Sequence, residues 1–412
     1  MKQDTRNQNE ERIIDEMESA LDKLLREGAR KMLQQAIENE VAEYLEAHQR
    51  ILDENGHRMV VRNGHMPERT LVTGVGPLPV KRPRVHDKRP GHRFTSAILP
   101  AFMRRVPSID ALIPVLYLKG VATNDFSEAL EAILGPNAAG LSATNIVRLK
   151  EGWKKDYEDW QSRDLSQSRY VYWWVDGIYF NVRLESDRPC VLVIMGARED
   201  GVKELVAVHD GHRESKESWL EVLRALKARG LRQAPKLAVG DGALGFWSAL
   251  EEEFSGTRAQ RCWVHKTVNI LDKLPKHKHA HAKGLIHDMY LAETYEEAIK
   301  AYDRFVKEYS AKWPKAVECL TKDKEVLFTF YDFPAEHWAH LRTTNPIEST
   351  FATVRHRTRQ TKGCGSRTAT LTMVFQLARQ AEKHWRRLNG YQHIIHLINN
   401  VVYKDGIMQK VA

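Results

Sequence analysis

The chain has 412 residues, of which 42% are hydrophobic and 28% charged, and its formal net charge is +9. This is the balance of a soluble globular protein with about two or three domains. No apolar run approaches the roughly 18 residues that cross a bilayer, the N-terminus lacks the apolar core of a signal peptide, and the cysteines form no CxxC pair. We therefore expect a cytoplasmic protein with reduced thiols and no membrane partner.

The first 55 residues are predicted to form helices. Between residues 11 and 50, apolar side chains recur at helical spacing, and acid–base pairs lie three or four residues apart. Gly28 is expected to break this pattern into separate helices. The surface of the helices is acidic, which favours packing or self-association over contact with a polyanion.

Residues 56–105 form a basic segment rich in Gly and Pro. Between residues 58 and 105, eleven Lys or Arg residues stand against two acids, and such a concentration of positive charge attracts a polyphosphate partner. The stretches 69–73 and 78–84 are expected to pair as short strands, and prolines keep the rest extended. The segment is either a poorly ordered linker or an arm along DNA, which would contact phosphates through Lys81, Arg82 and Arg84.

Residues 106–165 are predicted to contain a helix-turn-helix. Thr123 can cap the first helix, and Ser142 can cap the second. The second helix carries residue types that contact bases and phosphates, Arg148 among them. Two amphipathic helices joined by a short loop also occur in proteins that never touch DNA, so the pattern by itself leaves both interpretations open.

Residues 166–265 alternate between strands and helices. Three apolar, β-branched runs come first, and helix, strand, helix and strand follow. This order predicts an α/β domain with a mixed sheet and helices against it, as in a ribonuclease H-like fold. The predicted strands are 170–183, 190–199, 204–210, 236–241 and 258–263, and the predicted helices are 215–231 and 243–254.

Residues 266–341 are predicted to be an all-helical insertion into the same domain. Thr294 and Glu297 form a capping-box pattern that opens one of its helices. Residues 342–412 complete the domain with a helix around Glu348 and C-terminal helices. Their first part is basic, with six Lys or Arg residues and one acid between residues 342 and 367.

Two aspartates stand where neighbouring strands can bring them together. Asp176 lies within an apolar strand, where an unpaired carboxylate costs several kcal/mol or loses its charge. Asp241 ends the strand 236–241, so the two carboxylates converge if these strands are neighbours. For Asp241, a turn formed by Asp and the following Gly is an equally good explanation.

Glu348 is the third candidate carboxylate. Asn345 can cap a helix with Pro346 in its first position and Glu348 in its third, which is a complete capping-box explanation. However, Glu348 is the single acid of its basic stretch, and Arg355 and Arg359 share its helical face. A carboxylate and two arginines on one face could hold a metal ion beside a phosphodiester.

Three carboxylates suit the cleavage or exchange of phosphodiesters. Two Mg²⁺ ions about 3.5–4 Å apart can activate the attacking oxygen and neutralise the leaving oxygen. Mg²⁺ prefers carboxylate and water oxygens, so Cys and His ligands are not needed, and Mn²⁺ can substitute. We therefore expect Asp176, Asp241 and Glu348 to be the catalytic residues and the ligands of two Mg²⁺ ions.

Cys262 and His265 form a C-x-x-H pattern on the last predicted strand. Such a pattern is half of a zinc site, for which His277, His279 and His281 would be further ligands. The histidine cluster also fits a solvated polar loop. A structural or positioning role for Cys262 and His265 is the preferred interpretation.

The chain closely resembles the mutator-type transposases of bacterial insertion sequences in four stretches: "VDGIYFNVR", "VGDGALGFWSAL", "QRCWVHKTVNIL" and "RTTNPIESTFATVRHRTRQTKGCGSR". The resemblance covers nearly the whole chain. It implies that Asp176, Asp241 and Glu348 are the DDE triad of a ribonuclease H-like domain with an all-helical insertion. Cys262 and His265 match the C-x-x-H signature of that family. Many relatives have an Arg where this chain has Val268 before an Asn, so any contact made by that Arg is missing here.

The resemblance also implies a reaction and its partners. The enzyme would hydrolyse a strand at the end of its element, and the freed 3′-OH would attack another phosphodiester without a covalent protein–DNA intermediate. The partners would be the terminal inverted repeats and target DNA of a bacterial nucleoid. Joining two ends requires at least a dimer. Further predicted DNA contacts are Arg342, Arg355, Arg359 and Lys362.

Two other functions remain open on the sequence. A non-catalytic DNA-binding protein would use the helix-turn-helix and the basic segment, and its three carboxylates would only cap helices and form turns. A host nuclease with the same fold is the third hypothesis. Inverted repeats flanking the gene would favour transposition over both.

Overall fold

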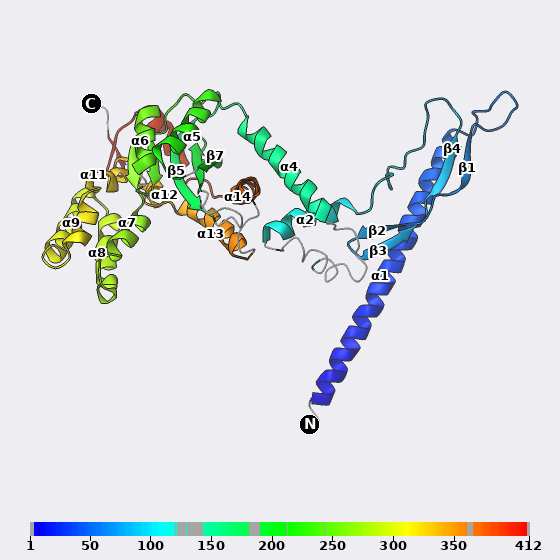
Figure 1. The fold of residues 1–412 in the computed structure, drawn as a ribbon, viewed down its shortest axis with the longest axis horizontal. Helices are drawn as coiled ribbons and strands as arrows, with labels where there is room; N and C mark the ends of the chain where they lie inside the picture. Colours follow the sequence, from blue (N-terminus) through cyan, green and yellow to red (C-terminus); the bar gives the residue numbers. More distant parts are fainter. Residues whose placement is uncertain are drawn as a thin grey trace. The chain divides into compact units, whose positions relative to one another are not determined.

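The computed structural model of the chain describes residues 4–119, 121, 129, 143–180, 190–211, 213–242, 244–360 and 366–409. It divides into two compact units, Met1–Leu149 and Lys150–Ala412 (Figure 1). The three candidate carboxylates, Asp176, Asp241 and Glu348, all belong to the second unit.

The first unit begins with one long helix, α1 (Asp4–Ala47). The predicted break at Gly28 is wrong, because the helix runs through this residue without interruption. A glycine costs a helix only about 1 kcal/mol relative to alanine, and strong helix formers on both sides compensate for that cost.

The basic segment of the first unit forms two antiparallel strand pairs, β1 with β4 and β2 with β3. Leu71 and Val80 are buried in one cluster with Ile37 of α1, so the described part of the segment is not a loose linker. The predicted pairing of 69–73 with 78–84 is confirmed as far as residue 80, where β3 ends. The elements are β1 (Val60–His65), β2 (Arg69–Thr73), β3 (Gly76–Val80), β4 (Pro83–Asp87) and α2 (Pro107–Lys119).

The predicted helix-turn-helix is described only in part. Its second helix is present as α4 (Ala143–Gln161), which begins directly after Ser142. Its first helix and the turn, including Thr123, lie almost wholly outside the described residues. The part of α4 from Lys150 onward belongs to the second unit, where the Tyr157 hydroxyl donates to the Val208 carbonyl at 2.9 Å.

The second unit is built on a five-stranded mixed sheet with the strand order β7-β6-β5-β8-β9. The pairs β7·β6 and β6·β5 are antiparallel, whereas β5·β8 and β8·β9 are parallel. The predicted α/β class and mixed sheet are therefore confirmed. The strands are β5 (Tyr170–Tyr179), β6 (Cys190–Arg198), β7 (Lys203–Gly211), β8 (Leu237–Gly240) and β9 (Arg258–Arg261).

The central strand β5 is buried on both faces, which explains its nearly continuous run of aromatic and β-branched residues. On one face, Trp173 and Val175 belong to a core that includes Trp219 of α5 (Lys216–Ala228) and Phe246 of α6 (Leu244–Glu253). Both of these tryptophans are fully buried. This core holds α5 and α6 against the sheet.

The opposite face of β5 is covered by segments from the C-terminal part of the chain. The Tyr172 hydroxyl lies 2.7 Å from Nδ1 of His337, and Nε1 of Trp174 donates to the His340 carbonyl at 2.8 Å. Side chains alternate along a strand, so Asp176 points to the same face as Tyr172 and Trp174. Helix α13 (Asn345–Gln360) also contacts β5 (Figure 1).

Helical segments fill the chain between β9 and α13. They are α7 (Trp263–Leu271), η1 (Lys276–Lys278), α8 (His279–Leu291), α9 (Tyr295–Tyr309), α10 (Pro314–Thr321), α11 (Lys324–Leu327), η2 (Thr329–Asp332), η3 (Ala335–His337) and α12 (Trp338–Leu341). The predicted capping box is confirmed, since the Thr294 hydroxyl accepts from the Glu297 backbone N–H at 3.3 Å. The chain ends with α14 (Arg367–Glu382), η4 (Tyr391–His393), α15 (Ile394–Ile398), β10 (Tyr403–Lys404) and β11 (Ile407–Met408).

Among the described helices, none has the length and apolarity that crossing a bilayer requires. The sheet of the second unit has a buried core that is rich in aromatic residues. Its tryptophans provide a selective probe of that core, because all ten follow residue 149.

We expect Leu192→Ala to lower the free energy of unfolding of the second unit by about 2–5 kcal/mol, because Leu192 is fully buried in the sheet core and leaves a cavity. Urea unfolding followed by tryptophan fluorescence would measure this loss in the second unit alone. Val202→Ala is the matched control, since Val202 is 42% exposed, and its effect should stay within about 0.5 kcal/mol. Equal losses for the two variants would contradict the described packing.

Candidate active site

The register of two parallel strands brings Asp176 and Asp241 together. In the β5·β8 pair, Trp174 lies opposite Val239 and Val175 opposite Gly240. Continued by one residue, this register sets Asp176 beside Asp241, and both then face the side of Trp174. Adjacent strands are about 4.8 Å apart, so the carboxylates can share one site. Asp241 is the more accessible of the two, with 41% of its side chain exposed.

Glu348 enters the site from the first turns of α13. The predicted cap by Asn345 is wrong in its position, because the Ile347 and Glu348 backbone N–H groups donate to the Thr344 carbonyl, at 2.9 and 3.0 Å. The Thr344 hydroxyl donates to Oε1 of Glu348 at 2.7 Å. Thr344 therefore both starts the helix and holds the carboxylate.

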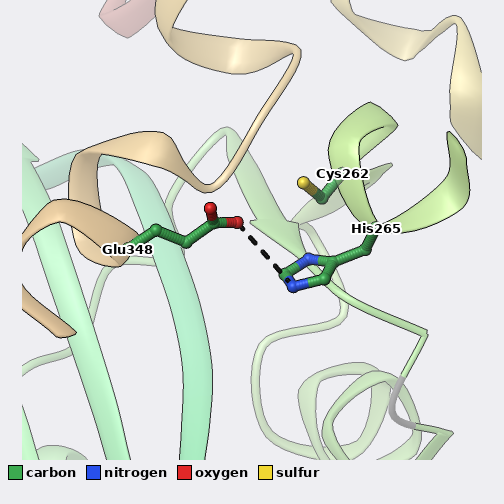
Figure 2. A group of neighbouring side chains, drawn as sticks. All are labelled: Cys262, His265 and Glu348. Atoms are coloured by element: carbon green, nitrogen blue, oxygen red, sulfur yellow. Dashed lines mark ion pairs between the residues drawn. The ribbon is translucent and has the colours of Figure 1, made fainter. Parts of the chain in front are cut away.

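Cys262 and His265 lie next to Glu348, at the start of α7. Their predicted location on the last strand is wrong: β9 ends at Arg261, Cys262 is the N-terminal cap residue of α7, and His265 is in the first turn of that helix. Figure 2 shows the thiol, the imidazole and the Glu348 carboxylate turned toward one another. Nε2 of His265 is 3.7 Å from Oε1 of Glu348.

Thr344 connects the three groups. Its backbone N–H lies 3.3 Å from Sγ of Cys262 and its hydroxyl lies 3.2 Å from the same sulfur. The hydroxyl is also 3.4 Å from Nδ1 of His265. One hydroxyl carries a single hydrogen, so its short bond to Glu348 leaves the backbone N–H as the steady donor to the sulfur.

The charges of the site are strongly coupled. Burial raises the pKa of Asp176 to about 7, an effect that His265 opposes and the nearby Glu214 reinforces. The hydrogen bond with Cys262 raises the pKa of His265 to about 9, and the charges of Asp241 and Asp176 act in the same direction. Burial disfavours the Cys262 thiolate, but hydrogen bonds from His265 and Thr344 outweigh it and lower the pKa of the thiol. The imidazolium is thus the local partner of several anions.

Two glycines make room for charged side chains that the sequence analysis did not identify. A methyl group at Gly177 would lie 2.6 Å from Cδ of Glu214, and one at Gly242 would overlap the Arg261 guanidinium. Burial and the charge of Asp241 raise the pKa of Glu214. Arg261, only 8% exposed, lies 3.8 Å from Asp241. The signal was present, because each glycine follows a candidate aspartate, but Gly242 was interpreted only as a turn residue and Gly177 was given no interpretation.

The donor set fits hard divalent cations. Asp176, Asp241, Glu348 and Glu214 supply carboxylate oxygens, the ligands that Mg²⁺ takes in proteins. The carboxylate of Asp176 is buried on the central strand, and its raised pKa means that it needs a proton or a cation. In the described part of the chain, the potential ligand atoms of Cys262, His265 and Glu348 all lie within 4.8 Å of one another, and the two aspartates are outside this tight group.

The predicted DNA contacts fall in both units. Lys81, Arg82, Arg84 and Arg148 belong to the first unit, and Lys81, Arg84 and Arg148 are exposed. Arg355 is exposed on α13 in the second unit, and its charge acts on Asp176. The side chain of Arg359 is not among the described parts of the chain, and Lys362 lies outside the described residues altogether.

Arg342 has a structural environment that the sequence did not indicate. Its guanidinium lies 4.9 Å from the ring centre of Phe330 and 5.3 Å from that of Trp338. Burial lowers its pKa. A cation stacked between aromatic rings stabilises the packing of the helical segment and is less accessible to a phosphate than Arg355.

The histidines proposed as further zinc ligands lie elsewhere. His281 forms an ion pair with Glu308 at 2.6 Å, and Nε2 of His279 lies 3.0 Å from the Leu274 carbonyl. Neither belongs to the group around Cys262. The zinc site is therefore not assembled in the way that the sequence spacing suggested.

Comparisons with known proteins agree on one group of relatives. Residues 1–388 match the family described as "Transposase, Mutator family". The chain is 52% identical over 301 residues to the transposase for insertion sequence element IS6120 of Mycolicibacterium smegmatis, covering 73% of this chain and 92% of that protein. It is 50% identical over 287 residues to the transposase for insertion sequence element IST2 of Acidithiobacillus ferrooxidans, and this match covers 68% of this chain and 95% of that protein.

One solved structure is titled "Drosophila P element transposase strand transfer complex". Its alignment with this protein covers 76% of this chain and 87% of the chain in that structure. The sequence identity is 11% and the TM-score 0.28. A likeness this weak supports no argument about the fold.

We expect Thr344→Val to lower the free energy of unfolding of the second unit by about 1–3 kcal/mol, because it removes the hydroxyl bonded to Glu348 and keeps the side-chain shape. Urea unfolding followed by tryptophan fluorescence would measure the loss. Thr321→Val is the matched control, since the Thr321 hydroxyl is exposed and donates to the Glu318 carbonyl of its own helix, at 3.3 Å. If both variants unfolded alike, Thr344 would not connect the site as described.

Proposed function

The chain belongs to the Mutator family of transposases, and from this we propose that it cuts and joins DNA at the ends of its own insertion sequence, with Asp176, Asp241 and Glu348 as a DDE triad. The observation that carries the proposal is the parallel register of β5 and β8. It brings two acidic side chains together at the C-terminal end of β8, between neighbouring strands of the sheet. Helix α13 adds the third, which lies more than 100 residues further along the chain.

The fold that we propose for the second unit is ribonuclease H-like. Three antiparallel strands in chain order, followed by two strands parallel to the first, support this assignment. Helices α5 and α6 cover one face in the positions that connect such strands. The segment between β9 and α13 would then be the insertion that separates the third carboxylate from the first two.

In the proposed reaction, Asp176, Asp241 and Glu348 would hold the divalent cations. When bound, two Mg²⁺ ions supply activation of the attacking oxygen and neutralisation of the leaving oxygen, and Mn²⁺ can substitute. Arg355 follows Glu348 by two helical turns on the same helix, so it can bind a phosphate oxygen next to the carboxylates. The attacking groups are water in the hydrolytic step and a DNA 3′-OH in the joining step.

Thr344, Cys262 and His265 are proposed to position Glu348. The threonine hydroxyl holds one carboxylate oxygen, and the imidazole lies 3.7 Å from it. A positive imidazolium would limit repulsion among the carboxylates before cations and DNA arrive. These residues act through Glu348 and need not touch the substrate.

DNA binding is proposed for the basic surfaces of both units. The exposed side chains of Lys81 and Arg84 and the exposed Arg148 of α4 would contact terminal repeats, with α4 as the second helix of a helix-turn-helix. Arg355 would contact DNA at the cleavage site. Phosphate contacts of this kind make binding strongly dependent on salt.

Self-association through α1 is proposed because apolar side chains lie exposed on it. Leu21, Leu24, Leu25 and Met32 have 55%, 68%, 50% and 75% of their surface exposed. A second copy of the chain could cover them, and two copies would bring together the two ends of an element.

The alternative, a non-catalytic DNA-binding protein, requires the three carboxylates to serve only as caps and turn residues. Asp176 does not fit that requirement, because it lies inside β5, paired with Val193 of β6. This observation favours the enzyme.

We expect Asp176→Asn, Asp241→Asn and Glu348→Gln each to reduce Mg²⁺-dependent strand cleavage and joining by on the order of a hundred- to a thousandfold, because each removes a charge that holds the cations. The assay would use DNA that carries the ends of the element, with DNA binding measured in parallel. Chelation of divalent cations should abolish both reactions.

Glu221→Gln is the control for these variants, since Glu221 is 71% exposed on α5. It should leave cleavage unchanged. Full activity of any triad variant would remove that residue from the proposed triad. Binding of the ends by all proteins without any cleavage by the wild type would favour the non-catalytic alternative.

Gly177→Ala is expected to lower cleavage by about 10- to 100-fold, because the new methyl group displaces Glu214 from the edge of the site. Gly284→Ala is the control, since nothing lies within 4 Å of a methyl group at that position. Glu214→Gln removes the charge of Glu214 but keeps its shape. If this variant lost as much cleavage as Gly177→Ala, the effect would be assigned to the Glu214 charge. Unchanged cleavage by Gly177→Ala would show that the site does not depend on the position of Glu214.

A further inference from the structure

We infer that Cys262, His265 and Glu348 form a binding site for Zn²⁺, which includes neither Asp176 nor Asp241 and shares only Glu348 with the proposed Mg²⁺ site. The site combines one thiolate, one imidazole and one carboxylate, the three ligand types that zinc takes in proteins. The C-x-x-H motif supplies two of the ligands, Cys262 and His265, and the third, Glu348, comes from α13.

The three ligand atoms are already close to the spacing that zinc requires. All lie within 4.8 Å of one another, and Nε2 of His265 is 3.7 Å from Oε1 of Glu348. Tetrahedral zinc with bonds of about 2.0–2.3 Å sets its ligands about 3.3–3.6 Å apart. Rotations of side chains alone can make up the difference, because Glu348 and His265 are each partly exposed, at 25% and 29%.

The thiol is held in a fixed position by the backbone around it. Cys262 is 1% exposed, and its N–H donates to the Gly240 carbonyl at 2.9 Å. The Thr344 backbone N–H lies 3.3 Å from Sγ. Such outer contacts orient metal ligands and raise affinity. The inner side of the site is therefore rigid, and the side formed by His265 and Glu348 is open to an arriving ion.

The chemistry separates this site from the proposed Mg²⁺ site. Thiolate and imidazole favour zinc, whereas carboxylates and water favour magnesium. Three protein ligands leave one tetrahedral position open. Glu348 has a place in both sites, so bound Zn²⁺ would draw this carboxylate away from the Mg²⁺ ions. This consequence rests on the proposed function, but the zinc site does not.

Titration of the reduced full-length chain with Co²⁺, the spectroscopic substitute for Zn²⁺, tests the inference. We expect a near-ultraviolet band from thiolate-to-cobalt charge transfer and intense visible bands of a tetrahedral ion, both removed by Zn²⁺. Cys262→Ser should abolish the charge-transfer band. His265→Gln and Glu348→Gln should each weaken Co²⁺ binding by at least about tenfold.

Two variants control for other ligands. Cys319→Ser removes a half-buried thiol on α10, and His281→Gln alters the histidine cluster; both should bind Co²⁺ as the wild type does. Absence of the thiolate band in the wild type, its persistence in Cys262→Ser, or its loss in Cys319→Ser would overturn the inference. The titration contains neither DNA nor Mg²⁺. Its result therefore does not depend on whether the protein cleaves and joins DNA strands as proposed. Circular dichroism of each variant establishes that the fold is intact.

Discussion

The parallel pairing of β5 with β8 is the constraint on which the candidate site depends. Its register sets Val175 opposite Gly240, and therefore Asp176 beside Asp241. Side chains alternate along a strand, so a shift of one residue would turn the two carboxylates to opposite faces of the sheet. The aromatic packing on both faces of β5 fixes this register, because Trp173 and Trp174 are fully buried on opposite sides.

Three segments that are distant in sequence meet at the end of β8. The Cys262 N–H donates to the Gly240 carbonyl and the Trp263 N–H donates to the Arg342 carbonyl, both at 2.9 Å. The Thr344 side chain then bonds to Glu348. These bonds bring the start of α7 and the start of α13 to the edge of the sheet where Asp241 stands. The helices between them can vary in length without moving the site, because the backbone bonds of Cys262 and Trp263 hold both ends of the insertion at the end of β8.

The site also depends on space and on balanced charge. Gly177 and Gly242 have no side chain, and the room is taken by Glu214 and Arg261. Several carboxylates so close together repel one another, and burial makes the cost larger. His265 and Arg261 supply positive charge in the protein itself. In the proposed reaction, divalent cations would add to that positive charge, whereas the DNA backbone is itself an anion.

The sequence by itself determined the α/β class of the second unit, the order of its five strands along the chain and the carboxylates that are candidates for its site. Local patterns carry that information: apolar runs for β5, β6 and β8, and the capping box at Thr294. Local patterns failed in three places. Neighbouring helix formers sustain α1 through Gly28, and Thr344 takes the cap expected at Asn345. The motif of Cys262 and His265 opens α7 and does not lie on the last strand. Only the tertiary structure decided which groups surround Glu348. Thr344 and Cys262 are 82 residues apart, and Glu214, which lies just before α5, reaches Gly177 of β5. Sequence spacing cannot reveal such contacts, because they follow from the strand register and from the packing of helices that no local pattern specifies.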